Sequence, residues 1–382
     1  MNISKFVTPE IIFGRGSLSQ VGESALRLGA SKAFVVSDPD VISAGWADLA
    51  IGYLRQVGLK TELFADLTTN PKDVEVEKGV EKYLDSECDA IIAVGGGSPT
   101  DVAKAVAMLA TNDGGLQQFE GINNITRPLP PMVMVPTTAG AGSEVSQFTI
   151  IIDTTRKLKM SIISKSLVPD IAIVDPELLR TKDSLLAAAT GVDALTHGIE
   201  SYVSLAATPL TDIHAINAIR LISQNLSQAV ADRNDIVANS NMAMASLSAG
   251  IAFSNAILGA THAMTHQVDG LIDQHHGETN AAILPHVMEF NLTEVPKRYA
   301  LIAEAFGCKT QGLDPVAAGR LAIDAVNALL QEIGLAKGLG EIGITQEMIG
   351  ALSKNALNDA CLVTNPREAT LHDIEEIFLK AL

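Results

Sequence analysis

Two short stretches concentrate the side chains that could bind a metal ion. Residues 259–277 read GATHAMTHQVDGLIDQHHG and hold four of the chain's eight histidines, and no histidine precedes His197. A second stretch, GVDALTHGIE at 191–200, supplies Asp193 and His197. Imidazole and carboxylate groups together suit Fe(II), Zn(II) or Mn(II). We therefore expect a metal centre built from these two stretches.

The spacing of these residues favours helices. Asp193 and His197 are four residues apart, as are His262 and His266. Residues at this spacing project from the same face of an α-helix, and the Ala-, Leu- and Met-rich surroundings favour helix formation. His276 precedes a glycine, which indicates a loop. The alternative is that these are ordinary core or surface histidines. Two pairs and a nearby histidine, in a chain otherwise poor in histidine, favour the metal. A site with few protein ligands and an open position is of the catalytic kind.

A glycine-rich loop indicates a second site. The run IIAVGGGSPTD at 91–101 is an apolar strand that ends in GGGS and leads into a helical pattern. Glycines let a backbone approach a phosphate closely, and a helix N-terminus offers unpaired N–H groups to it. The loop therefore predicts a cradle for a diphosphate, the alternative being a tight turn without a ligand. It matches neither a Walker loop nor G-x-G-x-x-G.

An acidic residue ends an earlier strand. Asp38 lies in VVSDPD, where it could bind ribose hydroxyls and repel a 2′-phosphate, which favours NAD over NADP. It could also simply begin a turn, because Asp-Pro is a common turn dipeptide. In a standard dinucleotide fold the acid follows the glycines by about 20 residues. Here it precedes them, so one dinucleotide bound by both requires a different topology.

A further polar segment, VPTTAGAGSEV at 135–145, follows another apolar run. Thr137, Thr138 and Ser143 could line the nicotinamide side of a cofactor or cap a helix. Lys159 could reach a ribose hydroxyl, although a single lysine is usually solvated surface.

Composition limits the class of protein. The chain has 382 residues, 47% hydrophobic and 19% charged, with a net charge of −17. This length predicts two domains. The acidic balance argues against nucleic acid or an anionic membrane surface as the main partner. Three widely separated cysteines, no signal-peptide core and no apolar run of spanning length predict a cytoplasmic protein.

The order of elements predicts an α/β domain followed by an all-helical one. Helical patterns alternate with apolar runs in the first half, which is typical of a parallel sheet, and helical patterns alone follow residue 176. We place the α/β dinucleotide-binding domain at 1–180 and the helical, metal-binding catalytic domain at 181–382, with a cleft between them. The predicted strands are 33–36, 90–94, 132–135, 148–152 and 171–174. The predicted helices are 71–84, 100–109, 185–203, 212–230, 237–252, 316–333 and 347–357.

Taken together, these motifs resemble the iron-dependent (group III) alcohol dehydrogenases. The segments GGGSPTD, PTTAGAGSEV, GVDALTHGIE, THAMTHQVDGLIDQHHG, AAILPHVMEFN and NPREAT stand in the order and spacing of that family. Within that family, the chain resembles lactaldehyde reductase and 1,3-propanediol dehydrogenase. The resemblance implies a metal-dependent, NAD(H)-linked alcohol dehydrogenase or aldehyde reductase that acts on a small primary alcohol or diol and assembles as a homodimer or larger homo-oligomer.

The resemblance also implies roles for individual residues. The implied metal ligands are Asp193, His197, His262 and His276, and His266 becomes a proton relay. Phe148 and Phe253 fall where the family lines its substrate pocket, the alternative being core packing. The implied cofactor-binding residues are Asp38, Gly95, Gly96, Gly97, Ser98, Asp101, Thr137, Thr138, Ser143 and Lys159.

The sequence departs from the family after His266. The family's Leu-Gly-Ala is replaced by Val268-Asp269-Gly270, and the aromatic residues before His276 are replaced by LIDQH at 271–275. The loop is therefore more polar, which leaves the substrate open.

Two properties of the reaction stay open. Fe(II) and Zn(II) both fit three imidazoles and one carboxylate, and the family name favours iron. In either case the metal is expected to act as a Lewis acid on the substrate oxygen. One alternative function is a zinc-dependent polyol dehydrogenase of the glycerol type. The other is a metal-dependent hydrolase, against which the glycine loop and Asp38 argue.

Overall fold

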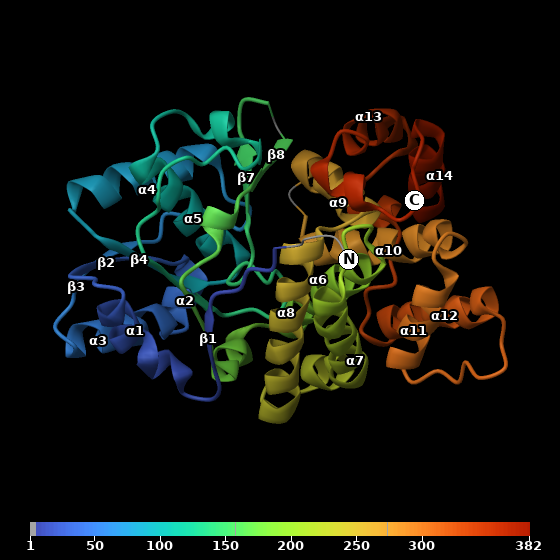
Figure 1. Ribbon diagram of the computed structural model, residues 1–382, viewed down its shortest axis with the longest axis horizontal. Coiled ribbons are helices and arrows are strands. Elements are labelled where there is room, and N and C mark those ends of the chain that lie inside the picture. Colours follow the sequence, from blue (N-terminus) through green and yellow to red (C-terminus); the bar gives the residue numbers. More distant parts are fainter. Residues whose placement is uncertain (1–4, 157, 273) are drawn as a thin grey trace. The chain divides into compact units, whose positions relative to one another are not determined.

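The computed structural model describes residues 5–156, 158–272 and 274–382. They form two compact units (Figure 1). The sheet unit is Val7–Lys182, and the helical unit is Asp183–Leu382 together with Lys5 and Phe6.

The sheet unit is built on six parallel strands in the order β1-β9-β6-β4-β2-β3. The central strand β4 is buried along its whole length, as its uninterrupted apolar sequence requires in a sheet covered on both faces. The strands are β1 (Glu10–Phe13), β2 (Lys32–Val36), β3 (Lys60–Phe64), β4 (Ala90–Gly95), β6 (Met132–Pro136) and β9 (Ile171–Val174).

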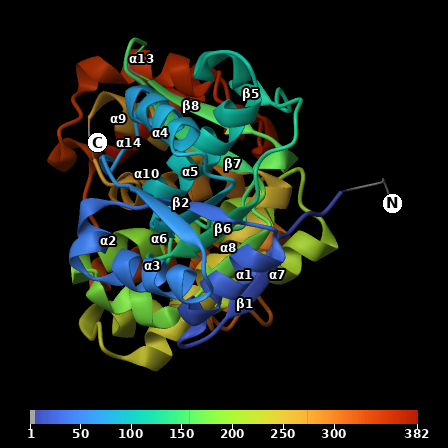
Figure 2. The same ribbon diagram turned by 90° about the vertical axis from the view of Figure 1, so that its left-hand side faces the viewer.

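Helices cover both faces of this sheet (Figure 2). Successive strand residues point to opposite faces, so Phe34 and Ile91 pack into one core while Val35 and Ile92 pack into the other. The first core includes α4 (Asp73–Asp85) and α5 (Gly97–Thr111). The second includes α1 (Val21–Arg27) and α3 (Trp46–Gln56). The short elements are α2 (Pro39–Ser43), η1 (Ser17–Gln20), η2 (Leu116–Phe119), η3 (Lys165–Leu167) and η4 (Pro176–Thr181).

One predicted strand belongs to a different sheet. Residues 148–152 lie in β7 (Phe148–Asp153), which pairs antiparallel with β8 (Leu158–Ile163) in a separate sheet completed by β5 (Gly121–Ile122). Its assignment to the parallel sheet was wrong. A short connection to an adjacent apolar strand permits antiparallel pairing, whereas parallel pairing needs a long crossover.

The helical unit contains no strand among its described residues. Several of its helices begin at a side-chain cap, as the sequence chemistry favours. Asp183, Thr208, Asp235 and Asp314 each accept a hydrogen bond from a backbone N–H of the helix that follows. The predicted fold class, an α/β part followed by a helical part, is therefore confirmed. The helices are α6 (Ser184–Val203), α7 (Pro209–Ala231), α8 (Ile236–Ala256), α9 (Ala260–Leu271), α10 (His276–Leu292), α11 (Pro296–Ala305), α12 (Pro315–Glu332), α13 (Gln346–Ala356) and α14 (Leu371–Ala381), with η5 (Leu339–Ile342) and η6 (Ala360–Thr364) between them.

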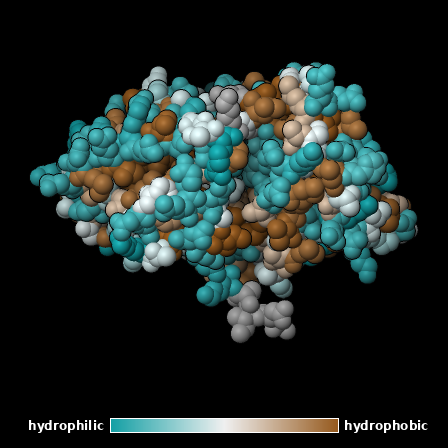
Figure 3. Space-filling view, turned by 90° about the horizontal axis from the view of Figure 1, so that it is seen from above, coloured by the Kyte–Doolittle hydropathy of each residue, from teal (hydrophilic) through white to brown (hydrophobic). Residues whose placement is uncertain are grey.

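In the described chain, α8 alone is long and apolar enough to cross a membrane by length and composition. Of the apolar stretch that meets this test, 72% is buried inside the protein, and core helices commonly meet it too. The face shown in Figure 3 mixes hydrophilic residues with hydrophobic patches.

Candidate functional site

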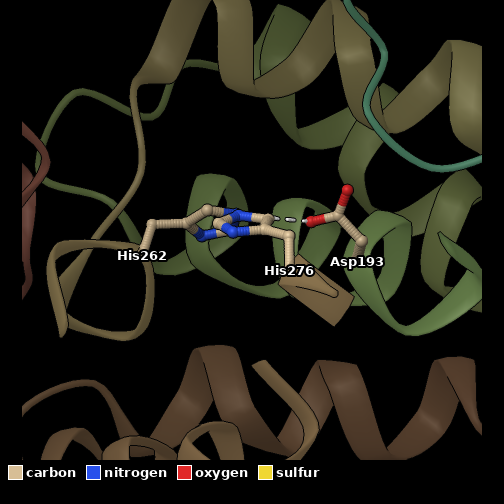
Figure 4. Close-up of side chains that lie close together, drawn as sticks. All are labelled: Asp193, His262 and His276. Atoms are coloured by element: carbon tan, nitrogen blue, oxygen red, sulfur yellow. Dashed lines mark ion pairs between the residues drawn. The ribbon is translucent and has the colours of Figure 1, made fainter. Parts of the chain in front are cut away.

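Three helices of the helical unit bring four ionisable side chains together. Asp193 and His197 lie on α6, His262 on α9 and His276 on α10. Asp193 Oδ1 lies 3.6 Å from Nε2 of both His197 and His262, and 3.8 Å from Nε2 of His276. Figure 4 shows Asp193, His262 and His276 pointing toward one another. One ligand atom from each of these three lies within 4.8 Å of the others, which is close enough to share one ion.

His276 does not lie in a loop, as the sequence had suggested, but is the first residue of α10. The following Gly277 misled the interpretation, because this glycine serves a close approach between helices and not a turn. A Cβ on Gly277 would lie 1.8 Å from the carbonyl oxygen of Ala189 on α6. The absence of a side chain therefore lets the start of α10 lie against α6 and brings His276 to Asp193.

Each of two imidazoles is oriented by a buried carboxylate on its other nitrogen. His262 Nδ1 lies 2.6 Å from Glu200 Oε2, and His276 Nδ1 lies 2.6 Å from Asp269 Oδ2. Outer carboxylates of this kind fix the tautomer of metal-binding histidines and leave Nε2 as the ligand atom.

The backbone around His262 is fixed by the same carboxylate. Glu200 also accepts hydrogen bonds from the amides of Gly259, Thr261 and His262, at 3.1, 2.6 and 3.4 Å. Asp193 is fixed too, because Asn280 Nδ2 donates to its Oδ1 at 3.0 Å. Ligand orientation therefore depends on several elements at once.

A cation fits this donor set. His262 Nε2 is buried and finds no hydrogen-bond partner in the described part of the chain, an exception that calls for a ligand. Burial by itself would raise the pKa of Asp193, but the neighbouring histidines lower it below the ordinary value. Burial lowers the pKa of His197 to about 3, so this imidazole is neutral at pH 7. For His262, Asp193 and Glu200 outweigh burial and raise the pKa to about 9. A bound cation would displace that proton.

His266 lies one turn further along α9 and is paired elsewhere. Its Nδ1 lies 2.9 Å from Oδ2 of Asp359, at the start of η6. His266, Asp359 and Cys361 form a second group whose potential ligand atoms lie within 4.8 Å of one another. Burial raises the pKa of the Cys361 thiol well above its usual value, so the thiol stays protonated. His266 is thus close to the proposed ligands, with ring centroids 5.7 Å from His276, but has its own partner.

The two predicted pocket phenylalanines lie in different units. Phe253 on α8 is 4% exposed and stacks on the ring of His197, with ring centroids 4.3 Å apart. Phe148 begins β7 and is 6% exposed.

The connection from α8 to α9 has an unusual backbone. Ile257 adopts φ 62° and ψ −171°, a conformation found almost only in glycine. Both flanking carbonyls are held in place. The Ser204 hydroxyl donates to Ala256 O and the Thr364 hydroxyl to Leu258 O, each at 2.6 Å. The corner that leads into the His262 helix is therefore strained and tightly bound.

In the sheet unit, the glycine-rich loop joins β4 to α5. A Cβ on Gly95 would lie 2.5 Å from the ring of Pro99, and a Cβ on Gly96 would lie 3.2 Å from the Thr138 hydroxyl. A Cβ on Gly97 would lie 3.2 Å from Ala141. The three glycines thus allow this loop and the 135–145 segment to approach each other closely at the N-terminus of α5.

Asp38 lies beside this loop although it precedes it by more than fifty residues. A Cβ on Gly95 would lie 3.4 Å from Asp38 Oδ2, because β2 and β4 are adjacent parallel strands. Asp38 also caps α2 by accepting a hydrogen bond from Val41 N at 2.8 Å. The Ser98 hydroxyl donates to the carbonyl of Thr69. Asp38 and the glycines thus lie side by side because their strands are neighbours in the sheet, although they are far apart in the sequence.

The other predicted cofactor residues are buried or partly buried, and two of them interact with the buried Asp101. Thr137 is fully buried, Thr138 is half-buried, and Ser143 hydrogen-bonds Asp101. Lys159 on β8 also interacts electrostatically with Asp101.

A buried ionic cluster consists of Asp101, Lys104 and Glu144. Lys104 Nζ donates to Ser146 O, Ser146 Oγ and Phe148 O at 2.7, 3.2 and 2.9 Å. Burial raises the pKa of Asp101 and of Glu144 and lowers that of Lys104. All three donors of the ammonium are therefore used within the unit.

Sequence reasoning missed the carboxylates that orient the histidines, Glu200, Asp269 and Asp359. Glu200 could have been found in the sequence, since it is the only acidic residue in the segment GIESYV at 198–203, which directly follows His197. Asp359 had none, because it is 93 residues from His266. Asp273, in the unusual loop, lies outside the described residues.

Comparison with known proteins agrees with this geometry. Residues 8–176 match the family model "Iron-containing alcohol dehydrogenase", and residues 187–382 match "Fe-containing alcohol dehydrogenase family, C-terminal". The chain is 41% identical to the NAD-dependent methanol dehydrogenase of Bacillus methanolicus, covering 99% of each, and 43% identical to the 1,3-propanediol dehydrogenase of Citrobacter freundii, covering 98% of each. A crystal structure of a 1,3-propanediol oxidoreductase superposes with a TM-score of 0.97 at 41% identity over 100% of both chains. The resemblance found in the sequence is confirmed, and the chain is an oxidoreductase that belongs to the iron-containing alcohol dehydrogenase family.

Proposed function

We propose that this enzyme catalyses reversible hydride transfer between a small primary alcohol or diol and NAD, at a divalent metal held by Asp193, His197, His262 and His276. The observation that carries this proposal is the convergence of three Nε2 atoms on Asp193 Oδ1 at 3.6 to 3.8 Å. The names of the relatives support the substrate class.

The proposed metal is Fe(II), with Zn(II) as the alternative. One carboxylate and three imidazoles suit either ion, and the family description favours iron. When bound, such an ion supplies Lewis acidity toward an alcohol or carbonyl oxygen. Glu200 and Asp269 hold the rings of His262 and His276 in place for this purpose.

His266 is proposed to move the proton, not to bind the metal. Its Nδ1 is occupied by Asp359, which leaves Nε2 to exchange a proton with the substrate hydroxyl or with water. Phe253 buries the face of His197 and helps to keep water from the ligand ring.

The cofactor is proposed to be NAD, bound by the sheet unit. The glycines at 95–97 leave room for a diphosphate at the N-terminus of α5. Asp38, beside Gly95, would accept hydrogen bonds from a ribose and repel the extra phosphate of NADP. The remaining proposed cofactor residues are Ser98, Asp101, Thr137, Thr138, Ser143 and Lys159. Phe148 in the sheet unit and Phe253 in the helical unit are each proposed as substrate-lining residues.

We propose that the domain at 1–180 binds the cofactor and that the domain at 181–382 binds the metal. We also propose a cytoplasmic homodimer or larger homo-oligomer. The net charge of −17 disfavours nucleic acid as a partner. A polyol dehydrogenase and a hydrolase are not favoured, since the named relatives oxidise alcohols or reduce aldehydes, and a hydrolase has no use for a dinucleotide loop.

The test is purification without oxygen, metal analysis and reconstitution. We expect about one iron per chain. After chelation, Fe(II) should restore oxidation of short alcohols and diols, with NAD preferred over NADP. A panel of alcohols and aldehydes with both cofactors and with Fe(II) or Zn(II) would define the substrate. Full turnover by protein stripped of every metal would refute the proposal.

A further inference from the structure

The carboxylate of Asp359 caps the short helix η6 and at the same time contacts a histidine on α9. Its Oδ1 accepts a hydrogen bond from Cys361 N at 2.9 Å at the start of η6. Its Oδ2 lies 2.9 Å from His266 Nδ1 and accepts a further hydrogen bond from Gln267 Nε2 at 3.3 Å. The side chain is only 9% exposed, and these three groups are its hydrogen-bond partners within the protein.

This environment fixes the tautomer of His266. Burial by itself would raise the pKa of Asp359, but His266 and the Cys361 amide hold it below its usual value. An ionised carboxylate only accepts hydrogen bonds, so His266 Nδ1 must carry the proton. In a neutral ring the lone pair then resides on Nε2. Asp359 thereby determines which nitrogen of His266 is basic.

We propose that Asp359 is a positioning residue that holds His266 as the Nδ1–H tautomer, so that Nε2 takes the proton of the substrate hydroxyl. This inference rests on the proposed alcohol dehydrogenase function. In the oxidation the C–H bond breaks and its electron pair leaves as hydride to NAD⁺. The O–H bond breaks and its proton goes to His266 Nε2, and then to solvent. In the reduction the imidazolium returns that proton to the oxygen.

Asp359 is not needed to attach its own segment to the protein. The Thr364 hydroxyl donates to Leu258 O at 2.6 Å, and Asn365 accepts from Ala260 N at 3.2 Å. The Asn365 and Asn291 amides also pair reciprocally at 2.9 and 3.0 Å. These contacts keep η6 against α9 when the charge at position 359 is removed, so D359N isolates the effect on His266.

The experiment is a double-mutant cycle with D359N, H266Q and the double variant. We expect D359N to lower kcat by about 10²-fold or more, as loss of the correct tautomer does in other His–Asp pairs. Metal content and the KM for NAD should stay unchanged. The double variant should be no slower than H266Q, because Asp359 acts only through His266. D314N is the matched control, since Asp314 caps α12 without a histidine partner, and should retain full activity.

A second measurement is independent of turnover. Nitrogen NMR of the zinc-reconstituted protein with labelled histidine reports which ring nitrogen carries hydrogen, and the His266 signals are those that vanish in H266Q. The unprotonated nitrogen should be Nε2 in the wild type and should change in D359N. Additive kinetic losses, loss of metal in D359N, or an unaltered tautomer would overturn the proposal. Absence of alcohol turnover in the wild type would instead refute the proposed function, and the tautomer measurement would still stand.

Discussion

The Lys104 cluster of the sheet unit and the His262 cluster of the helical unit are both buried, but they differ in whether their polar groups all find partners. In the sheet unit, Lys104 directs its three ammonium donors to three acceptors within the unit. In the helical unit, buried carboxylates surround the imidazoles, yet His262 Nε2 has no hydrogen-bond partner among the described residues and lies 3.6 Å from Asp193 Oδ1. A cluster that satisfies itself supports a fold, whereas one that is short of a positive charge is suited to bind a cation.

Removing a proposed ligand should give the largest effect. H262A takes away one Nε2 and removes the imidazole contact of Glu200 Oε2. Because even outer residues of metal sites contribute about 10- to 100-fold to affinity, we expect H262A to lose bound metal and turnover altogether. Metal analysis and activity would be compared with H372A, which changes an exposed histidine on α14. An H262A protein with one tightly bound metal per chain would contradict the assignment.

Removing Lys104, the cation of the cluster in the sheet unit, should lower the free energy of unfolding. K104M leaves Asp101 and Glu144 buried without a compensating charge, which costs about 3 to 5 kcal/mol of unfolding free energy. K78M is the control, because Lys78 forms an exposed ion pair with Asp66 and such pairs contribute little to stability. Urea titrations of both variants would measure the difference. Equal destabilisation would remove the distinction between the two clusters.

The complete cluster should also make stability depend on pH. Burial raises the pKa of Glu144 from its ordinary 4.5 to about 7, so the folded protein holds this proton more tightly than the unfolded chain. The Glu144 contribution is therefore fully present below pH 4.5 and is lost as the pH rises through 7, with a slope of up to about 1.4 kcal/mol per pH unit. Melting curves of wild type and E144Q at pH 5 and 8 should show E144Q gaining relative stability at pH 8. A difference that is constant with pH would exclude this account.

The smallest effect concerns the strained corner before α9. Ile257 holds a backbone conformation that costs about 1 to 3 kcal/mol in a residue with a side chain, while glycine loses about 0.5 to 1 kcal/mol through chain entropy. We expect I257G to gain about 1 kcal/mol in unfolding free energy, and I257V, which keeps the branched side chain, to gain nothing. A less stable I257G would show that the side chain contributes more than the strain costs.

The sequence could predict much of the molecule because local patterns carry the information. Apolar runs and helical periodicity identify most elements, and the spacing of Asp193 with His197 and of His262 with His266 places these residues on helices. Sheet membership was harder, since pairing partners lie far apart, and 148–152 was assigned to the wrong sheet.

The carboxylates that orient the histidines could not be predicted from the sequence for the same reason. Asp359 and Glu200 act on histidines 93 and 62 residues away, so only the folded chain reveals the pairs. Gly277 carried a misleading signal, because a glycine that permits two helices to touch reads in sequence like one that ends a helix.

Glu200 shows how little freedom such a position leaves to evolution. One carboxylate serves three amides and an imidazole, all of them donors. Glutamine has the same shape but would turn a donating –NH₂ toward some of these hydrogens, and aspartate would be too short to reach all of them. Any single substitution therefore disturbs four interactions at once, and we expect this position to tolerate no gradual exchange of residues.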